Sequence, residues 1–361
     1  MDNFPLIEVS GTSYEIGYQY GQFCKEKIAG SIACYEEMFM DYSGLTWERA
    51  KELSTRFVDV IRDYNPDYLE EIRGVSDGSG FEFEDILALN CRSELVFVGN
   101  EFDKSDGGCT SIGVSSEAGA NQDAYLAHNW DWKTSQQASM VLIKVRQQHG
   151  KPDIFMVTEA GIIGKTGFNS AGICLFLNAL STNQAPKGLP LHIAMRGILD
   201  CESIAEAITA ATRMNLGCCA NFMIGHKNGE CVDIEIENEE FDVLYPQDGI
   251  IVHTNHFISN RLPLAPRRDT TKQKFPDTFV RLGRADKLLR QKKNGISETD
   301  IMNVLSDHVE YPSGICRHDD LKMPVGLRIG TVFSMVVNLT QEKIYFCKGN
   351  PCERKYEEYT L

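Results

Sequence analysis

The hydrophobic pattern of this chain changes abruptly at Cys109, and this change limits the folds that the chain can adopt. Residues 12–95 read as helical, because Thr12 and Glu15 fit a capping box and apolar residues follow at approximately helical spacing. From Cys109 onward the pattern consists of short β-rich runs bounded by Gly, Asn and Asp. A helical segment followed by many strands and a few helices predicts an α+β layered architecture with predominantly antiparallel sheets.

The same patterns place the individual elements. Helices are expected near 47–63, 66–74, 84–94, 191–213, 278–292 and 297–308. Strands are expected at 110–115, 124–130, 139–146, 153–158, 173–178, 219–225, 231–236, 250–254, 331–339 and 342–347. Two polar segments, 100–108 and 260–276, are expected to be exposed. The second is either a mobile flap or a solvated surface loop.

Composition narrows the function before any motif is considered. The 361 residues, 42% of them hydrophobic, suffice for one large domain or two ordinary ones. A formal net charge of -15 argues against the basic footprint that nucleic acid requires, so we expect a small-molecule partner and no nucleic acid. The N-terminal residues carry no leader pattern and no run of about 18 apolar residues occurs, which predicts a cytoplasmic protein without membrane contact.

The twelve cysteines lie mostly inside apolar runs, where cysteine behaves as a small hydrophobic residue. This placement predicts buried thiols in a reducing compartment rather than disulfides.

The junction at Cys109 carries the first chemical signal. Gly107 and Gly108 allow backbone conformations closed to other residues, which a thiol needs to attack the carbonyl of its own preceding residue. The resulting thioester would be hydrolysed, cutting the chain between Gly108 and Cys109 and leaving a free α-amine. Because such an amine has a pKa of about 8, an N-terminal cysteine carries its own general base. Alternatively, Gly-Gly-Cys is a turn that leads into a strand with a buried thiol.

Four other residues are candidate partners of this thiol. A hairpin would bring Asp131 near the start of the first strand, where a carboxylate can hold the new amine. Asn178 and Asn255 interrupt apolar runs and are suited to donate to an oxyanion, where one donor is worth roughly 3–4 kcal/mol. Arg317 would favour the thiolate or bind a substrate carboxylate. Each also has a structural alternative: a turn, a backbone cap or a surface ion pair.

Metal binding is the competing interpretation of several polar pairs. These pairs are His253-x-x-His256, Cys316-x-His318 and Cys218-Cys219. None has the Cys-x-x-Cys or His-Glu-x-x-His spacing of a zinc motif, so we expect no metal site. There is also no Gly-x-Ser-x-Gly elbow and no glycine-rich phosphate loop, and we expect no cofactor.

Seven motifs occur in order over nearly the whole chain. They lie at 9–21, 106–111, 129–131, 167–172, 177–180, 253–256 and 315–318. Together they resemble the acyl-coenzyme A:6-aminopenicillanic acid acyltransferase family, the peptidase C45 branch of the N-terminal-nucleophile hydrolases. The resemblance implies a four-layer αββα sandwich with antiparallel sheets. It also implies autocleavage into an α chain, 1–108, and a β chain, 109–361, that stay associated as one domain.

The resemblance assigns roles by motif. The implied catalytic residues are the nucleophile Cys109, the amine-side Asp131, the oxyanion-side Asn178 and Asn255, and the active-site Arg317. Gly108 and Ser111 fall at positions linked to processing. Two departures stand out: Tyr20 replaces a frequent histidine, and Gly107 lengthens the usual Asp-Gly-Cys.

The implied chemistry is an acyl-enzyme on Cys109 that passes its acyl group to an amine or to water. The chain would then be an N-acyltransferase, with a coenzyme A thioester as acyl donor, or a hydrolase of small amide conjugates. Two other functions remain open: an unprocessed binding protein on the same fold, and a metallohydrolase.

Overall fold

The computed structural model describes residues 3–96, 108–182, 187–237, 239–262, 276–293, 295–324 and 328–361. Its α-helices include six in the N-terminal segment: α1 (Ser13–Ser43), α2 (Trp47–Ser54), α3 (Val58–Tyr64), α4 (Pro66–Ser79), α5 (Phe83–Asn90) and α6 (Arg92–Val96). Four further helices follow: α7 (Leu191–Leu199), α8 (Ile204–Thr212), α10 (Asp277–Arg290) and α11 (Glu298–Leu305).

The strands form two sheets. The eight-stranded sheet has the order β1 (Leu6–Gly11), β4 (Met140–Gln147), β5 (Ile154–Glu159), β6 (Thr166–Asn169), β7 (Ile173–Ala179), β8 (Ala220–His226), β9 (Cys231–Glu237) and β10 (Glu240–Leu244). The six-stranded sheet has the order β11 (Ile250–His253), β2 (Gly108–Val114), β3 (Tyr125–Lys133), β12 (Ile329–Asn338), β13 (Lys343–Lys348) and β14 (Glu357–Tyr359). Pairing is antiparallel throughout except between β1 and β4, which are parallel.

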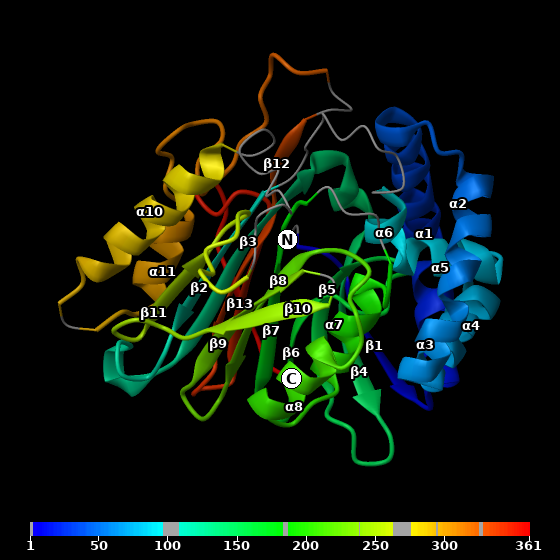
Figure 1. Cartoon of the computed structure of the whole chain (residues 1–361), viewed down its shortest axis with the longest axis horizontal. Coiled ribbons are helices and arrows are strands. Elements are labelled where there is room, and N and C mark those ends of the chain that lie inside the picture. Colours follow the sequence, from blue (N-terminus) through cyan, green and yellow to red (C-terminus); the bar gives the residue numbers. More distant parts are fainter. Residues whose placement is uncertain are drawn as a thin grey trace.

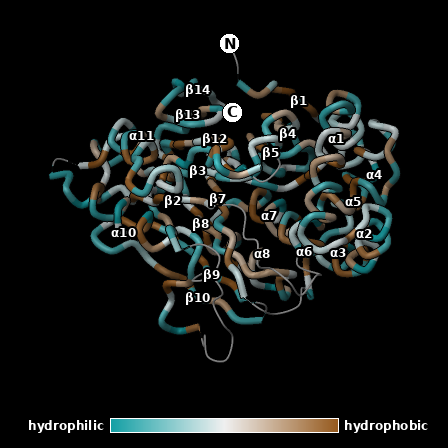
Figure 2. The backbone as a smooth tube through the Cα atoms, turned by 90° about the horizontal axis from the view of Figure 1, so that it is seen from above, coloured by the Kyte–Doolittle hydropathy of each residue, from teal (hydrophilic) through white to brown (hydrophobic). Residues whose placement is uncertain are grey.

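The two sheets stack face to face, with helices on both outer sides. Helices α10 and α11 lie beside the six-stranded sheet, and α1 to α6 lie on the opposite side of the molecule (Figures 1 and 2). Three large clusters of buried apolar side chains fill the three interfaces between these four layers. The αββα architecture is therefore confirmed.

Helices α1 and α4 approach each other closely because glycine lies at their contact. A Cβ atom on Gly17 would lie 2.0 Å from the carbonyl oxygen of Glu71, and one on Gly74 would lie 2.2 Å from that of Tyr14. Tyr20, one turn further along α1, is buried and accepts a hydrogen bond of 2.9 Å from the Gly161 N–H. The helical segment is thus fixed against the loop that follows β5.

Most predicted elements are present, and the differences have local causes. The strands β1, β6, β10 and β14 were not predicted; they are short, and β1, β10 and β14 lie at sheet edges. The helix predicted at 191–213 is two helices, because Ser203 caps the N-terminus of α8 by accepting a hydrogen bond from the Glu206 N–H. The exposed loops predicted at 100–108 and 260–276 fall largely outside the described residues.

The burial of the cysteines and the character of the helices can also be compared with the sequence. Ten of the twelve cysteines are buried, as predicted, while Cys34 is partly exposed and Cys352 exposed. Across the described ranges, none of the helices combines the length and the apolar character that a bilayer crossing requires.

Candidate active site

The register of β2 against β3 decides what surrounds Cys109. Gly108 pairs with Asp131 and Cys109 pairs with Trp130, as the predicted hairpin requires. Since side chains alternate along a strand, neighbouring residues face opposite sides of the sheet. Cys109 and Trp130 point inward and pack between the two sheets. Asp131 points outward, and a Cβ atom added to Gly108 would lie 3.0 Å from its carboxylate.

A chain of alternating charges covers the outer side of Gly108. Arg317 Nε lies 3.4 Å from Asp131 Oδ2, and its Nη2 donates to Asp277 Oδ2 at 2.5 Å. Arg281 Nε donates to the same Asp277 oxygen at 2.7 Å. Burial raises the pKa of Asp131 although Arg317 opposes the shift, and the Thr331 hydroxyl donates to Asp131 Oδ1 at 2.8 Å.

The backbone of Cys109 is held through both its N–H and its carbonyl oxygen. Its N–H donates to Asn255 Oδ1 at 2.9 Å. Its carbonyl oxygen accepts from Arg281 Nη1 at 2.6 Å, and Arg281 Nη2 also donates to Asn255 Oδ1 at 2.8 Å. Asn255 and Arg281 therefore fix the residue through its peptide groups and leave its side chain to the inner face.

The inner face carries the thiol and a buried lysine. Burial, with a further contribution from Asp131, raises the pKa of the Cys109 thiol to about 12, while Arg281 and a backbone hydrogen bond from Ala179 oppose the shift. Lys165 Nζ lies 3.5 Å from the centre of the Trp130 ring and pairs with the Glu159 carboxylate. Burial lowers the pKa of Lys165 to about 7. The thiol of Cys109 is among the groups that oppose this shift and raise the pKa.

The pairing of Lys165 is shared, because Glu159 has further partners. Arg92 Nη2 lies 3.0 Å from Glu159 Oε1, and the Tyr35 hydroxyl donates to the same oxygen at 2.7 Å. Although burial acts against ionisation, Arg92 and Lys165 hold the pKa of Glu159 well below its ordinary value. Two cations thus face one carboxylate: burial is the main cause of the lowered pKa of Lys165, the Arg92 guanidinium lowers this pKa further, and Glu159 opposes both.

Ser111, two residues after Cys109 on β2, forms a hydrogen bond with Asn178. The Ser111 hydroxyl donates to Asn178 Oδ1 at 2.7 Å and lies 2.9 Å from His128 Nδ1. Asn178 Nδ2 donates to the His253 carbonyl oxygen at 3.4 Å, and Asn178 Oδ1 also accepts from Asn221 Nδ2 at 3.3 Å. Burial, together with Lys165, lowers the pKa of His128 to about 3, so this imidazole is neutral at physiological pH.

The structure therefore brings together Cys109, Asp131, Asn255 and Arg317, and places Asn178 beside Ser111.

Sequence reasoning missed three residues of this site. Arg281 shares the core-facing side of α10 with buried Thr278, Ala285 and Leu289, so an arginine on an apolar helix face was the available signal. Asp277 begins the same helix, and Lys165 follows the apolar run Ile162-Ile163-Gly164.

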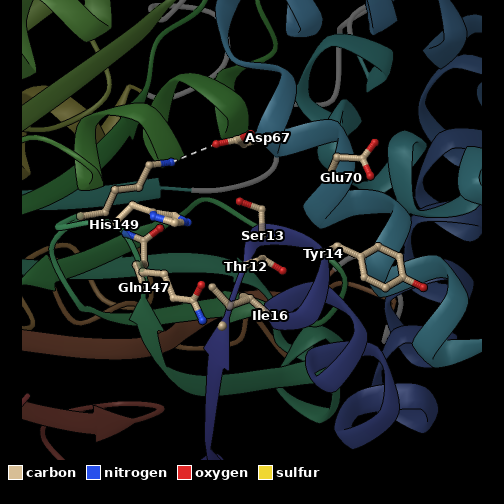
Figure 3. Close-up of a pocket in the computed structure, with 11 residues that line it drawn as sticks. Thr12, Ser13, Tyr14, Ile16, Asp67, Glu70, Gln147 and His149 are labelled. Carbon is tan, nitrogen blue, oxygen red and sulfur yellow. Dashed lines mark hydrogen bonds and ion pairs between the residues drawn. The ribbon is translucent and has the colours of Figure 1, made fainter.

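A separate pocket of about 260 Å³ lies at the start of α1. Its lining includes Thr12, Ser13, Asp67, Gln147 and His149, and an ion pair of 3.5 Å joins Asp67 to Lys151 across it (Figure 3). It shares none of the residues around Cys109.

Comparison with known proteins decides the family. Residues 118–353 match the family model described as acyl-coenzyme A:6-aminopenicillanic acid acyl-transferase. The chain belongs to this family. It is 32% identical over 314 residues to the acyl-coenzyme A:6-aminopenicillanic-acid-acyltransferase 40 kDa form of Emericella nidulans, across 86% of this chain and 84% of that protein. Membership in the acyltransferase family makes acyl transfer or amide hydrolysis the supported chemistry.

Other similarities are weaker. A β-alanyl-dopamine/carcinine hydrolase of Drosophila melanogaster is 22% identical over 250 residues, which cover 64% of each protein. Among solved structures, a variant of conjugated bile acid hydrolase from Clostridium perfringens aligns over 70% of this chain and 97% of that chain, with a TM-score of 0.46 and 10% identity. Penicillin V acylase from Agrobacterium tumefaciens aligns over 68% and 76%, with a TM-score of 0.36 and 12% identity.

Proposed function

We propose that this acyltransferase-family chain cuts itself between Gly108 and Cys109 and then uses Cys109 as an N-terminal nucleophile on small acyl amides or thioesters. The proposal rests on the way in which side chains surround the Gly108–Cys109 peptide bond. Asn255 and Arg281 bind its backbone on one side, while Asp131 and Arg317 flank Gly108 on the other. The bond to be cut is therefore surrounded by four side chains from distant parts of the chain, two of which hydrogen-bond its Cys109 side.

In the cleavage step, Cys109 Sγ attacks the Gly108 carbonyl carbon, and the carbon–nitrogen bond breaks as the nitrogen gains a proton. Water then hydrolyses the thioester, which releases a Gly108 carboxylate and restores the thiol. The new carboxylate forms beside the Asp131 carboxylate, and the repulsion of these like charges favours its departure.

The uncleaved chain needs a base other than the α-amine, since burial holds the Cys109 thiol protonated. We assign this role to Lys165, which lies over Trp130 on the same inner face. Its lowered pKa of about 7 makes a neutral amine available at physiological pH.

After cleavage, the nitrogen that donates to Asn255 Oδ1 becomes the α-amine, and Asp131 is the nearby carboxylate that can hold it. This amine takes the thiol proton, and Sγ attacks the substrate carbonyl to form an acyl-enzyme. The Ala179 N–H faces the sulfur and is suited to stabilise the oxyanion. An amine acceptor or water then takes the acyl group.

Arg317 is engaged by Asp131 and Asp277. We therefore propose that it positions Asp131 and does not bind a substrate carboxylate. Asn178 orients Ser111 and precedes Ala179, so its effect on the thiol is indirect.

Replacement of the thiol tests the proposal. Cys109→Ala is expected to stay at 40.5 kDa and to be inactive, whereas the wild type gives fragments of about 12 and 28 kDa, in proportion to 108 and 253 of the 361 residues. Cys174→Ala, another buried strand cysteine, is the control and is expected to cleave normally. Intact mass spectrometry with a panel of acyl amides and acyl thioesters measures both properties. A cleaved Cys109→Ala chain, or active wild type that stays uncut, contradicts the mechanism.

A further inference from the structure

A second group of reactive side chains lies beside Arg317, outside the site described above. His308, Cys316, His318 and Cys352 each offer one ligand atom, and these four atoms all lie within 4.8 Å of one another. They come from three separate segments: the turn after α11, the loop before β12 and the turn after β13. Among the described residues, this is the one group of this composition that could hold a metal ion.

The spacing of these atoms fits a single tetrahedral ion. The two imidazole Nε2 atoms are 3.1 Å apart and the two sulfur atoms 3.5 Å apart. His318 Nε2 lies 3.6 Å from Cys316 Sγ and 3.3 Å from Cys352 Sγ. Zinc bonds of about 2.3 Å to sulfur and about 2.0 Å to nitrogen give tetrahedral edges of roughly 3.3–3.8 Å. Two thiolates and two imidazoles are also a common ligand set of structural zinc sites.

The surroundings hold the ligands in place. The Asn350 side chain donates to Cys316 Sγ at 3.4 Å and to the Arg317 carbonyl oxygen at 2.7 Å. The Glu353 carboxylate lies 3.7 Å from His318 Nδ1, the ring nitrogen that does not face the other ligands. A carboxylate on that side of a histidine is a common outer partner of zinc ligands. His308 and Cys352 are exposed, which leaves a route for the ion.

We propose that His308, Cys316, His318 and Cys352 bind one structural zinc ion that fixes the loop carrying Arg317. Binding releases two thiol protons to solvent, and the two imidazoles bind in their neutral form, so the filled site has no net charge. The sequence led us to expect no metal here, because Cys316-x-His318 alone has no zinc spacing. The fold supplies His308 and Cys352 as the remaining ligands.

The site would act on the acyl-transfer centre through Arg317. This residue lies between two ligands in sequence, and its N–H donates to Thr331 Oγ1, whose hydroxyl also donates to Asp131. Closing a loop with a metal restricts its unfolded conformations and so stabilises the folded position.

Metal analysis of the purified, reduced full chain tests the proposal. The wild type, refolded or expressed with zinc, is expected to hold about one zinc per chain after desalting. With Co²⁺ in place of zinc, it should show the visible bands of tetrahedral cobalt and a near-ultraviolet thiolate-to-cobalt band. Cys352→Ser, at an exposed turn, should weaken zinc affinity by at least about 100-fold, beyond the 10–100-fold cost of losing an outer partner. The control Cys34→Ser, at a partly exposed cysteine elsewhere, should bind as the wild type does.

The outcomes separate the possibilities. Substoichiometric zinc in the wild type, or equal affinity in Cys352→Ser, overturns the proposal. A chain 2 Da lighter with Cys316 bonded to Cys352, isolated under rapid alkylation, also overturns it and shows a redox pair instead. The Cys109→Ala chain should retain its zinc, so failure of self-cleavage and failure of metal binding are distinguished.

Discussion

The two faces of the β2–β3 pair differ sharply around one peptide bond. The outer face carries the alternating charges Asp131, Arg317, Asp277 and Arg281, linked by direct hydrogen bonds and ion pairs. The inner face carries a protonated thiol, an aromatic ring and a lysine whose charge is disfavoured by burial. The two-residue period of a strand makes this separation possible, because adjacent residues face opposite layers.

The difference assigns separate tasks to the two faces. The outer face holds the backbone by fixed charges, so substitution of its charged side chains should mainly lower the free energy of unfolding. In the proposed mechanism the inner face moves a proton, so substitution of its side chains should mainly lower the rate of reaction. Substitutions on each face test whether this distinction holds.

The largest effect is expected on the outer face. Arg281→Leu removes one of the two guanidinium partners of Asp277 and leaves the Cys109 carbonyl oxygen without its buried side-chain donor, and loss of one member of such a buried pair costs about 3–5 kcal/mol. Urea unfolding of the uncleavable Cys109→Ala chain measures this cost. The control Arg284→Leu, on the same helix but half-exposed, should cost at most about 1 kcal/mol. Equal losses of unfolding free energy in the two variants would show that the outer charges do not stabilise the Cys109 backbone.

An intermediate effect is expected on the inner face. Lys165→Met should slow self-cleavage on the order of 100-fold, the lower end for loss of a general base. Because burial lowers the pKa of Lys165 to about 7, the neutral base is present above that pH, and wild-type cleavage should speed up as pH rises through it. Cell-free synthesis followed by electrophoresis at several pH values measures both.

Lys133→Met is the matched control for this change. Lys133 is also buried and lies 5.0 Å from the centre of an aromatic ring, that of Tyr42, but it is the last residue of β3 and pairs with Ile329 of β12. Its cleavage should keep the wild-type rate and pH dependence. A Lys165→Met chain that cleaves at the wild-type rate would remove the lysine from the mechanism.

The smallest effect is expected for Arg317→Lys. The charge is retained, but a point charge does not reproduce the planar fork that reaches Asp131 and Asp277 together. We expect roughly a tenfold loss of turnover, or about 1.4 kcal/mol, with KM nearly unchanged because Arg317 positions Asp131. Arg290→Lys, at the outer end of α10, is the control. A rise in KM alone would instead assign Arg317 to substrate binding.

Much of the layered fold is visible in the sequence because long helices and central strands have clear periods. The α10 helix and β2 to β5 were placed within about three residues. Edge strands such as β10 were missed because a short, half-exposed run has no distinct pattern.

The site divides in a similar way. Asp131 could be placed opposite Gly108, since a hairpin makes that contact local. Arg281 and Lys165 could not, because a helix packed on one face and a loop packed on the other bring them in from distant positions. The sequence pattern alone does not predict which layer packs against each face of a strand.

The pairing of β1 with β4 has a consequence for the cut chain. Through β1 and its helices, the segment before Gly108 supplies part of the same apolar cluster as β4, β5 and β7. A break at Gly108 would thus turn one polypeptide into two whose contact surface is the protein interior itself. Neither piece could leave without exposing that interior to water, so separation and denaturation would be a single event.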